Sequence, residues 1–407
     1  MEGYKIINDP VFGFIKMRRG LLYDIVEHRL FQRLGRINQL GLAFVVYPGA
    51  RHTRFQHSLG SFYLMTEAVK SLREKGVYIF DSEEEAVEAA ILMHDIGHSP
   101  FSHVLENTLI NGISHEELSI MMMEQINRDL GGRLNLAISI FKDEYPNKIF
   151  HQLISSQLDM DRLDYLRRDS FYTGVTEGNI GSARIIKMLN VSDDRLVVDH
   201  KGIYSVENYL TSRRLMYWQV YLHRTAVGYE RVLINTLQRA KALVAEGYEL
   251  FASPALAYFI KNDVDRKWFD THEEALQMYA DLDDSDIWSA LKAWRHADDR
   301  ILSMLATDML DRQLFRVEVR DEPISEEEAN GLAVQMAKTM NVTPEESRRY
   351  MMSITEAQKD MYNPEDDSIG ILYKDGTVKD IAEASEILNV QLLSKKIRKY
   401  YLCYQRT

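Results

Sequence analysis

Apolar residues recur at three- and four-residue intervals through most of the first 310 residues, and this spacing restricts the chain to a mainly helical fold. One such stripe contains Phe55, Leu59, Phe62 and Val69, and Gly76 is placed to end the helix that carries it. A second helix is predicted over residues 84–93, where alanines alternate with a glutamate-rich face. The stripes predict helices that share one core.

A third helix is predicted from about residue 149 to 168, with a polar face. Asp161, Arg162, Tyr165 and Asp169 fall at i, i+1, i+4 and i+8, so they share that face. Residues 195–205 then change to a strand-like pattern with a turn at residues 200–202, which predicts a short hairpin.

The sequence pattern changes after Leu314. Residues 315–319 alternate as a strand, and Ser325 with Glu328 forms the capping box that opens a helix. Residues 350–354 and 369–373 are further strand candidates. The expected fold is therefore mainly α with a small C-terminal α+β (β-α-β-β) module. We expect three regions: a helical catalytic body over residues 1–240, a helical extension over 241–312, and the module over 313–407.

Composition and net charge limit the classes of molecule that this chain is expected to bind. Hydrophobic residues make up 45% and charged residues 27%, as in soluble globular proteins. A net charge of −12 argues against nucleic acid or anionic lipid as the main partner. The single cysteine, Cys403, and the interrupted apolar pattern of residues 1–17 favour a cytoplasmic protein that does not span a membrane.

The densest chemical feature is the string over residues 93–103, where His94, His98 and His103 accompany Asp95. Neighbouring side chains at a helix end project about 100° apart, so His94 and Asp95 can offer a metal both an imidazole nitrogen and a carboxylate oxygen. Such mixed ligands suit Mn, Fe, Zn or Ni, with Mg possible at an oxygen-rich position.

Two ligands make a poor metal site, so others are expected from neighbouring helices. His57, near the start of the first predicted helix, and Asp161, on the polar face of the third, are the best candidates. Asp159 and Asp164 are close in sequence to Asp161, and either is the ligand if the helix has a different register.

The ordered set of motifs over about the first 230 residues resembles the HD-domain phosphohydrolases, and within them the deoxynucleoside triphosphate triphosphohydrolases. The matching stretches are residues 9–15, 31–34, 39–41, 48–50, 54–58, 94–103, 161–165, 168–169, 201–202 and 221–223. The resemblance implies an HD-domain helical body, a nucleotide substrate and a homo-oligomer.

The resemblance also assigns roles to residues of this chain. The metal ligands are His57, His94, Asp95 and Asp161, which the spacing had already indicated. Catalytic groups near the phosphates are His98, His103 and His115, with Glu106 as the acidic partner of His115. The expected substrate contacts are Arg54, Arg162, Arg213 and Arg224 for the phosphates, and Gln39, Leu40, Tyr165, Asp169 and Tyr221 for the deoxyribose.

Elementary chemistry agrees with these roles. A triphosphate needs cations, and arginine offers phosphate oxygens a fixed fork of donors. A bound metal brings the pKa of water from 15.7 towards ~7 and polarises the phosphoryl oxygen. We expect His103 to protonate the departing 5′-oxygen, with His115, oriented by Glu106, as the second choice.

Simpler interpretations accompany these roles. Arg54 and Arg213 can serve as plain salt-bridge partners, and Tyr165 and Tyr221 as core aromatics. The alternative functions are hydrolysis of another nucleotide or phosphate ester by the same metal site, and nucleotide binding without turnover. A screen of metals against nucleotides separates them.

Overall fold

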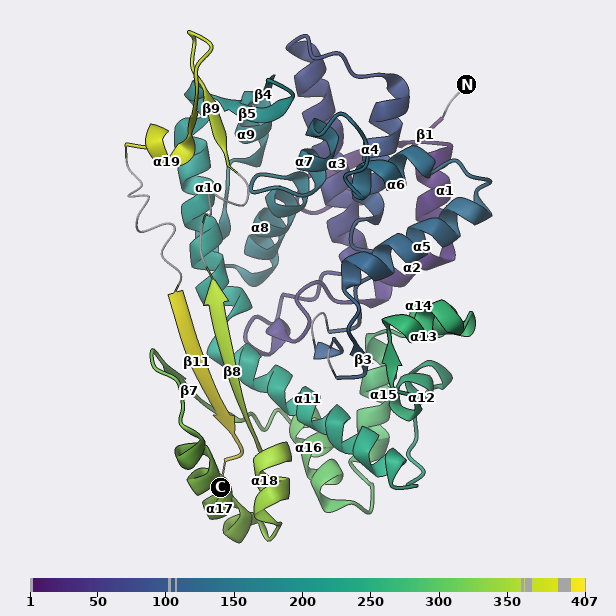
Figure 1. Ribbon diagram of the computed structural model, residues 1–407, viewed down its shortest axis with the longest axis vertical. Helices are drawn as coiled ribbons and strands as arrows, with labels where there is room; N and C mark the ends of the chain where they lie inside the picture. Colours follow the sequence, from purple (N-terminus) through teal and green to yellow (C-terminus); the bar gives the residue numbers. More distant parts are fainter. Residues whose placement is uncertain are drawn as a thin grey trace.

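In the helical body, one long helix packs against two others (Figure 1). α3 (Arg54–Glu74) packs against α4 (Asp81–Met93) and against α8 (Met160–Thr173). The computed structural model describes residues 3–101, 104–106, 108–359, 362, 368–386 and 397–406. Within these ranges helices predominate, which confirms the expected mainly α fold with small sheets.

The other elements of the body surround these helices. An N-terminal hairpin joins β1 (Tyr4–Asp9) to β2 (Gly13–Arg18). The helices are α1 (Leu21–Glu27), α2 (Arg29–Gln32), η1 (Arg33–Arg36), η2 (Ala43–Val45), α5 (His115–Asp129), α6 (Asn135–Phe141), α7 (Ile149–Ile154), η4 (Thr176–Gly178), α9 (Ser182–Met188), η5 (His200–Gly202), α10 (Ile203–Met216), the π-helical η6 (Tyr217–Tyr221) and α11 (Arg224–Ala245).

Two expectations for this body were wrong. The helix predicted over 149–168 is divided into α7 and α8, because Asp159 caps a new helix by accepting a hydrogen bond from the Arg162 amide at 2.7 Å. The predicted hairpin is displaced: β4 (Leu189–Ser192) pairs with β5 (Arg195–Asp199), and residues 203–205 begin α10 instead. Asp193 and Asp194, both with positive φ, form its turn.

α11 connects the body to the rest of the chain and runs beside the last helices and strands (Figure 1). A helical layer follows, composed of α12 (Pro254–Lys261), α13 (Arg266–Thr271), α14 (Glu274–Asp281), α15 (Asp284–Trp294) and α16 (Arg300–Leu310), with β6 (Val264–Asp265) pairing with β3 (Ile110–Asn111). The buried apolar side chains of all these elements form one continuous core.

The C-terminal residues contribute strands to two different sheets. β7 (Arg316–Arg320), β11 (Ile397–Tyr404) and β8 (Met352–Lys359) form a three-stranded sheet beside α17 (Glu326–Met340) and α18 (Pro344–Tyr350). β9 (Gly370–Leu372) and β10 (Val378–Asp380), followed by α19 (Ile381–Ala384), join β5 of the body. The expected β-α-β-β order therefore lacks α18, β10, α19 and β11, and the division into three regions stays a prediction.

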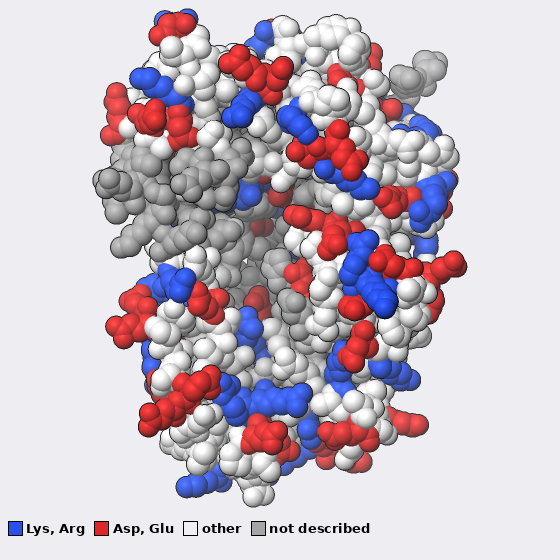
Figure 2. All heavy atoms as spheres, in the orientation of Figure 1, with Lys and Arg blue, Asp and Glu red and all other residues white. Residues whose placement is uncertain are grey.

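Acidic and basic side chains are interspersed over the face seen in Figure 2. Among the residues that the structure describes, no helix combines the length and the apolar character needed to cross a membrane.

Candidate active site

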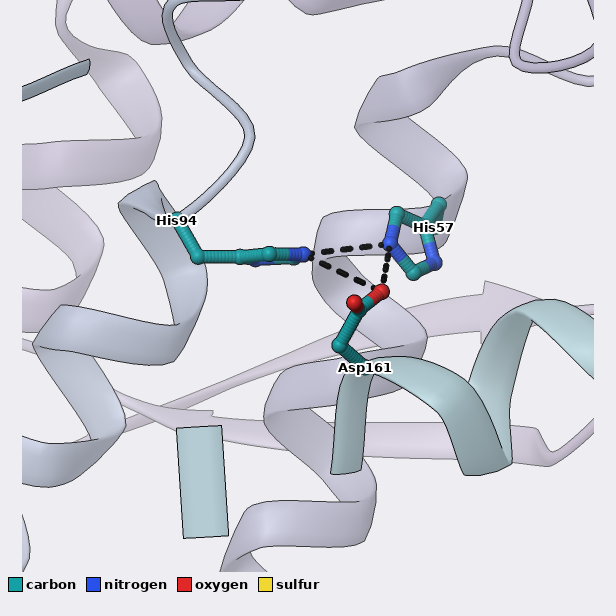
Figure 3. A group of neighbouring side chains, drawn as sticks. All are labelled: His57, His94 and Asp161. Atoms are coloured by element: carbon teal, nitrogen blue, oxygen red, sulfur yellow. Dashed lines mark hydrogen bonds and ion pairs between the residues drawn. The ribbon is translucent and has the colours of Figure 1, made fainter. Parts of the chain in front are cut away.

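Three side chains from three different helices converge on one point (Figure 3). His57 comes from the first turn of α3, His94 follows the last residue of α4, and Asp161 lies in the first turn of α8. His57 Nε2 lies 3.2 Å from His94 Nε2 and 3.0 Å from Asp161 Oδ1, and His94 Nε2 lies 3.4 Å from the same oxygen. Two imidazoles and a carboxylate at these separations form a potential metal site.

Both imidazoles have their second nitrogen occupied by a different acceptor. His57 Nδ1 lies 2.7 Å from Asp164 Oδ2, and His94 Nδ1 lies 2.7 Å from the Ile91 carbonyl. Each Nδ1 is therefore the protonated nitrogen, which leaves each Nε2 lone pair directed at the point where Asp161 also lies. This donor set fits a divalent cation.

A buried chain of charges fixes His57 from behind. The Arg168 guanidinium donates to Asp164 at 2.9 and 3.0 Å and to Asp9 Oδ2 at 2.8 Å. Asp9 in turn accepts the amides of Val11 and Phe12. Asp164, an alternative ligand by its place in the sequence, lies on the opposite side of the His57 ring from Asp161, at the Nδ1 nitrogen.

Asp95 lies beside the three converging groups. Its Oδ2 forms an ion pair with Arg54, and its Oδ1 lies 3.5 Å from His94 Nε2 and 3.3 Å from His98 Nδ1. Asp159 instead caps α8 and binds Arg162 at 3.0 Å.

The carboxylates of the site favour a positive charge among the converging side chains. Burial disfavours protonation of His57, yet hydrogen bonds to Asp161 and Asp164 prevail and raise its pKa to about 10. Burial likewise opposes ionisation of Asp161, but the hydrogen bonds with His57 and His94 lower its pKa. A cation bound among these atoms would be stabilised by the same carboxylates.

Two of the predicted phosphate-site histidines lie in contact. The His98 and His115 rings have centroids 4.0 Å apart, and His115 Nδ1 lies 3.4 Å from Glu106 Oε1. His103 lies outside the described residues. The structure therefore brings together His98, His115 and Glu106, whose catalytic roles stay predictions.

A cavity of about 660 Å³ opens from Asp161. The predicted site residues that line it are Gln39, Leu40, Arg54, Asp95, His98, His115, Asp161, Arg162, Tyr165, Asp169 and Tyr221. A depression of about 890 Å³ between the β4–β5 hairpin and α7 contains none of them. We therefore place substrate binding in the smaller cavity.

Two residues of the cavity lining, Asp169 and Tyr221, form a hydrogen-bonded trio with His52. Tyr221 donates to Asp169 Oδ2 at 2.7 Å, and His52 Nε2 lies 2.7 Å from Asp169 Oδ1. His52 also stacks on Tyr172, with centroids 4.4 Å apart. Sequence reasoning missed His52, because a lone histidine outside the dense motif carried no distinguishing pattern.

The predicted arginines occupy different environments. Arg213 is buried and donates to Gln157 Oε1 at 2.8 Å, whereas Arg224 is exposed at the first position of α11. Neither is among the residues that line the cavity, although Arg54 and Arg162 are.

The comparisons with known proteins agree with this geometry. The HD domain family matches residues 54–168, and the HD associated region matches residues 180–250. A phosphohydrolase crystal structure from Bacteroides thetaiotaomicron is 63% identical, with a TM-score of 0.97 over 99% of this chain and 100% of that one.

Two curated relatives are more distant. The uncharacterized protein YwfO of Bacillus subtilis is 34% identical over 98% of this chain and 92% of its own length. The deoxynucleoside triphosphate triphosphohydrolase SAMHD1 of Homo sapiens is 30% identical over 65% of this chain and 48% of its own.

Proposed function

Because the chain belongs to the HD-domain phosphohydrolases, we propose that it is a metal-dependent enzyme that cleaves deoxynucleoside triphosphates into a deoxynucleoside and triphosphate. The observation that carries this proposal is the convergence of His57, His94 and Asp161 beside a cavity whose lining includes Arg54 and Arg162, the two predicted phosphate contacts. The likeness to a named triphosphohydrolase supports the choice of substrate.

His57, His94 and Asp161 would hold the metal, with Asp95 as the fourth ligand. The set of nitrogen and oxygen donors suits Mn, Fe, Zn or Ni, and Mg at an oxygen-rich position. When bound, a divalent metal supplies a Lewis acid and activates water for attack on phosphorus.

The protein side chains position the triphosphate. Arg54 and Arg162 line the cavity beside Asp161 and offer planar donors to the phosphate oxygens. Arg54 also holds Asp95 in place. The predicted phosphate contacts of Arg213 and Arg224 stay predictions from the sequence. Neither residue lines the cavity, so the substrate would have to extend beyond the lining to reach them.

Water attacks the α-phosphorus in line, and the bond between that phosphorus and O5′ breaks. O5′ then needs a proton, which a nearby histidine supplies. The sequence favours His103 as this donor, although His103 lies outside the described residues. His115 is the second candidate, and Glu106 Oε1 lies 3.4 Å from its Nδ1, where it can orient the ring.

The sugar would lie against Leu40, Tyr165 and Tyr221. Asp169 accepts hydrogen bonds at both oxygens, yet a carboxylate has about four lone-pair sites and can also accept from a 3′-hydroxyl, with Gln39 as a second partner. An added 2′-hydroxyl would meet Leu40 and Tyr221 without a partner. Leaving a hydroxyl unpaired costs ~1 to 3 kcal/mol, which predicts a roughly ten- to hundredfold preference for deoxynucleotides.

Chromatography of the products from each deoxy- and ribonucleoside triphosphate tests this proposal. We expect deoxynucleoside and intact triphosphate, with ribonucleotides cleaved more slowly. Pyrophosphate with a monophosphate would indicate a different bond. Equal rates on ribonucleotides would contradict the roles of Leu40 and Tyr221, and binding without any turnover would favour a nucleotide-binding protein.

A further inference from the structure

The catalytic cavity extends beyond the predicted sugar wall to a second end. There it is lined by α11 residues Ala226, Val227, Glu230 and Arg231, and by Thr355, Glu356 and Ala357 of β8. The α11 residues fall at i, i+1, i+4 and i+5, so they lie on one face of the helix. This face of α11 lines the same cavity as Tyr221, and the proposed function assigns no role to it.

Arg231 is an unusual feature of this end. Its Nε is buried without a hydrogen-bond partner, and Arg231 forms no ion pair with the part of the chain that the structure describes. The side chain as a whole is only partly buried, and its two terminal nitrogens are not among the buried atoms of the described residues. Because Arg231 lines the cavity, these terminal donors can reach a ligand there.

The opposite side of this end is an edge strand. β8 is the last strand of the order β7-β11-β8, and its Thr355 pairs with Tyr401 of β11. Alternate residues of an edge strand direct their N–H and C=O away from the sheet. Residues 355–357 therefore present backbone donors and acceptors beside Arg231.

We propose that Arg231 and the β8 edge form the base subsite of this cavity, and that Arg231 selects guanine. Guanine presents O6 and N7 as two adjacent acceptors, which match the fork of an arginine. Its N1–H and amino group can donate to a backbone carbonyl on β8. Adenine and cytosine place an amino group where guanine or thymine has a carbonyl, so their donors would face the donors of Arg231.

The inference rests on the proposed function, since it places the base by continuing from the sugar wall. Its position is consistent with the length of the cavity: Ala226 and Arg231 are separated by about 7.5 Å along the helix axis. The base would lie between Tyr221 and Arg231, with its plane against the short side chains of Ala226 and Val227.

The experiment measures kcat/KM for the four deoxynucleoside triphosphates with the metal-loaded protein. Wild-type protein should prefer dGTP over dATP, and Arg231→Ala should lower the value for dGTP by roughly ten- to a hundredfold. The value for dATP should stay within about twofold. Arg231→Lys should also lose the preference, because an ammonium keeps the charge but lacks the fork.

A guanine analogue separates direct recognition from an indirect effect. With 7-deaza-dGTP, which lacks the N7 acceptor, wild-type protein should lose most of the preference, and Arg231→Ala should have little further effect. Arg349→Ala is the matched control, because Arg349 lines a separate depression of about 430 Å³ that shares Arg231 with the cavity. It should leave all four values unchanged.

The outcomes distinguish the two proposals. Wild-type protein that cleaves all four substrates equally, or a loss in Arg231→Ala shared equally by all four, would overturn the base subsite while leaving the reaction intact. Wild-type protein that cleaves none of them would overturn the proposed function. Thermal unfolding that is as cooperative for Arg231→Ala as for wild type shows that a loss of activity on dGTP does not come from misfolding.

Discussion

The two ring nitrogens of His57 have different tasks. Nδ1 is held by Asp164 at 2.7 Å, and Nε2 is thereby fixed as the nitrogen that faces His94 and Asp161. Without Asp164 the ring could take the other tautomer or rotate, so the proposed metal site would depend on a residue that is not one of its ligands.

Asp164→Asn should therefore weaken metal binding by roughly ten- to a hundredfold. It should also destabilise the fold by about 3 kcal/mol, because Arg168 keeps Asp9 as a charged partner but loses Asp164. Metal titration by calorimetry, at a temperature where circular dichroism shows folded protein, measures the first effect. Asp308→Asn is the control, since Asp308 is also buried but binds Gln405. Unchanged metal affinity in Asp164→Asn would contradict the orienting role.

His94→Ala and Asp95→Ala should each remove both metal and activity. Both residues follow the end of α4, so the substitutions leave the helical hydrogen bonds of α4 in place and circular dichroism should change little. Elemental analysis of the purified variants measures the metal content. Active wild-type protein without metal, or full activity in Asp95→Ala, would refute the site assignment.

The sequence indicated the side chains that converge, His57, His94 and Asp161, but not the residues that hold them in place. His94 and Asp95 are adjacent, and the spacing along α8 identified Asp161 as part of one polar face. The ion pairs between Asp9, Arg168 and Asp164 join the N-terminal hairpin to α8. Residues so far apart in sequence form no local pattern from which this contact could be predicted. His52 was missed for the same reason.

The close approach of α3 and α8 depends on Gly60. A Cβ at this position would overlap the Asp164 carboxylate and the Arg168 guanidinium. Gly60→Ala should therefore destabilise the protein by at least about 2 kcal/mol and weaken metal binding, because the pair that orients His57 must move. Urea unfolding and metal titration measure both effects.

Gly331→Ala is a matched helical control. No atom lies within 4 Å of a Cβ built at Gly331 in α17, so the added methyl should stabilise the protein by about 0.5 to 1 kcal/mol. A Gly60→Ala variant as stable as Gly331→Ala would show that the two helices separate without cost.

The titration of Glu88 in α4, which forms an ion pair with Arg18 of β2, makes the stability of the fold depend on pH. Burial raises the pKa of Glu88 to about 7, although Arg18 lies 3.2 Å away. The folded protein therefore holds the proton more tightly than the unfolded chain, whose value is near 4.5. The resulting stabilisation is full below pH 4.5 and is lost as the pH rises through about 7.

Glu88→Gln removes this titration. The free energy of unfolding of the variant relative to wild type should rise with pH between 4.5 and 7, by up to about 3 kcal/mol. Denaturant unfolding at several pH values measures the difference. A difference that stays constant with pH would show that Glu88 ionises normally in the folded protein.

Elements were predicted well where apolar spacing was long and less well where it was short. α3 and α4 follow stripes of many residues. Residues 203–205 have the β-branched and aromatic composition of a strand, yet they begin α10, with Ile203 buried and Tyr204 exposed. Tertiary packing overrides such short preferences.

At the scale of the whole molecule, we expect a homo-oligomer, as the family resemblance implies. The N-terminal hairpin leaves Tyr4, Ile6 and Phe14 more than half exposed, which provides apolar surface for association. Light scattering at micromolar concentration should give at least twice the chain mass of 47.3 kDa. A stable, fully active monomer would contradict this expectation.

The C-terminal module is more closely connected to the body than the sequence suggested. β9 pairs in parallel with β5, and β8 lines the cavity that begins at Asp161. The sequence pattern of a strand indicates that it pairs, but not which distant strand is its partner. The pairing of β5 with β9 could therefore not be predicted from either segment alone. The lining of this cavity includes residues from Gln39 in the body to Tyr401 in the last strand.

In the proposed reaction, water attacks the α-phosphorus of a deoxynucleoside triphosphate and the bond to O5′ breaks. Hydrolysis in water enriched in oxygen-18, followed by mass spectrometry of the products, shows which bond is cleaved. We expect one heavy oxygen in the released triphosphate and none in the deoxynucleoside. Heavy oxygen in the deoxynucleoside, or products other than a deoxynucleoside and intact triphosphate, would contradict it.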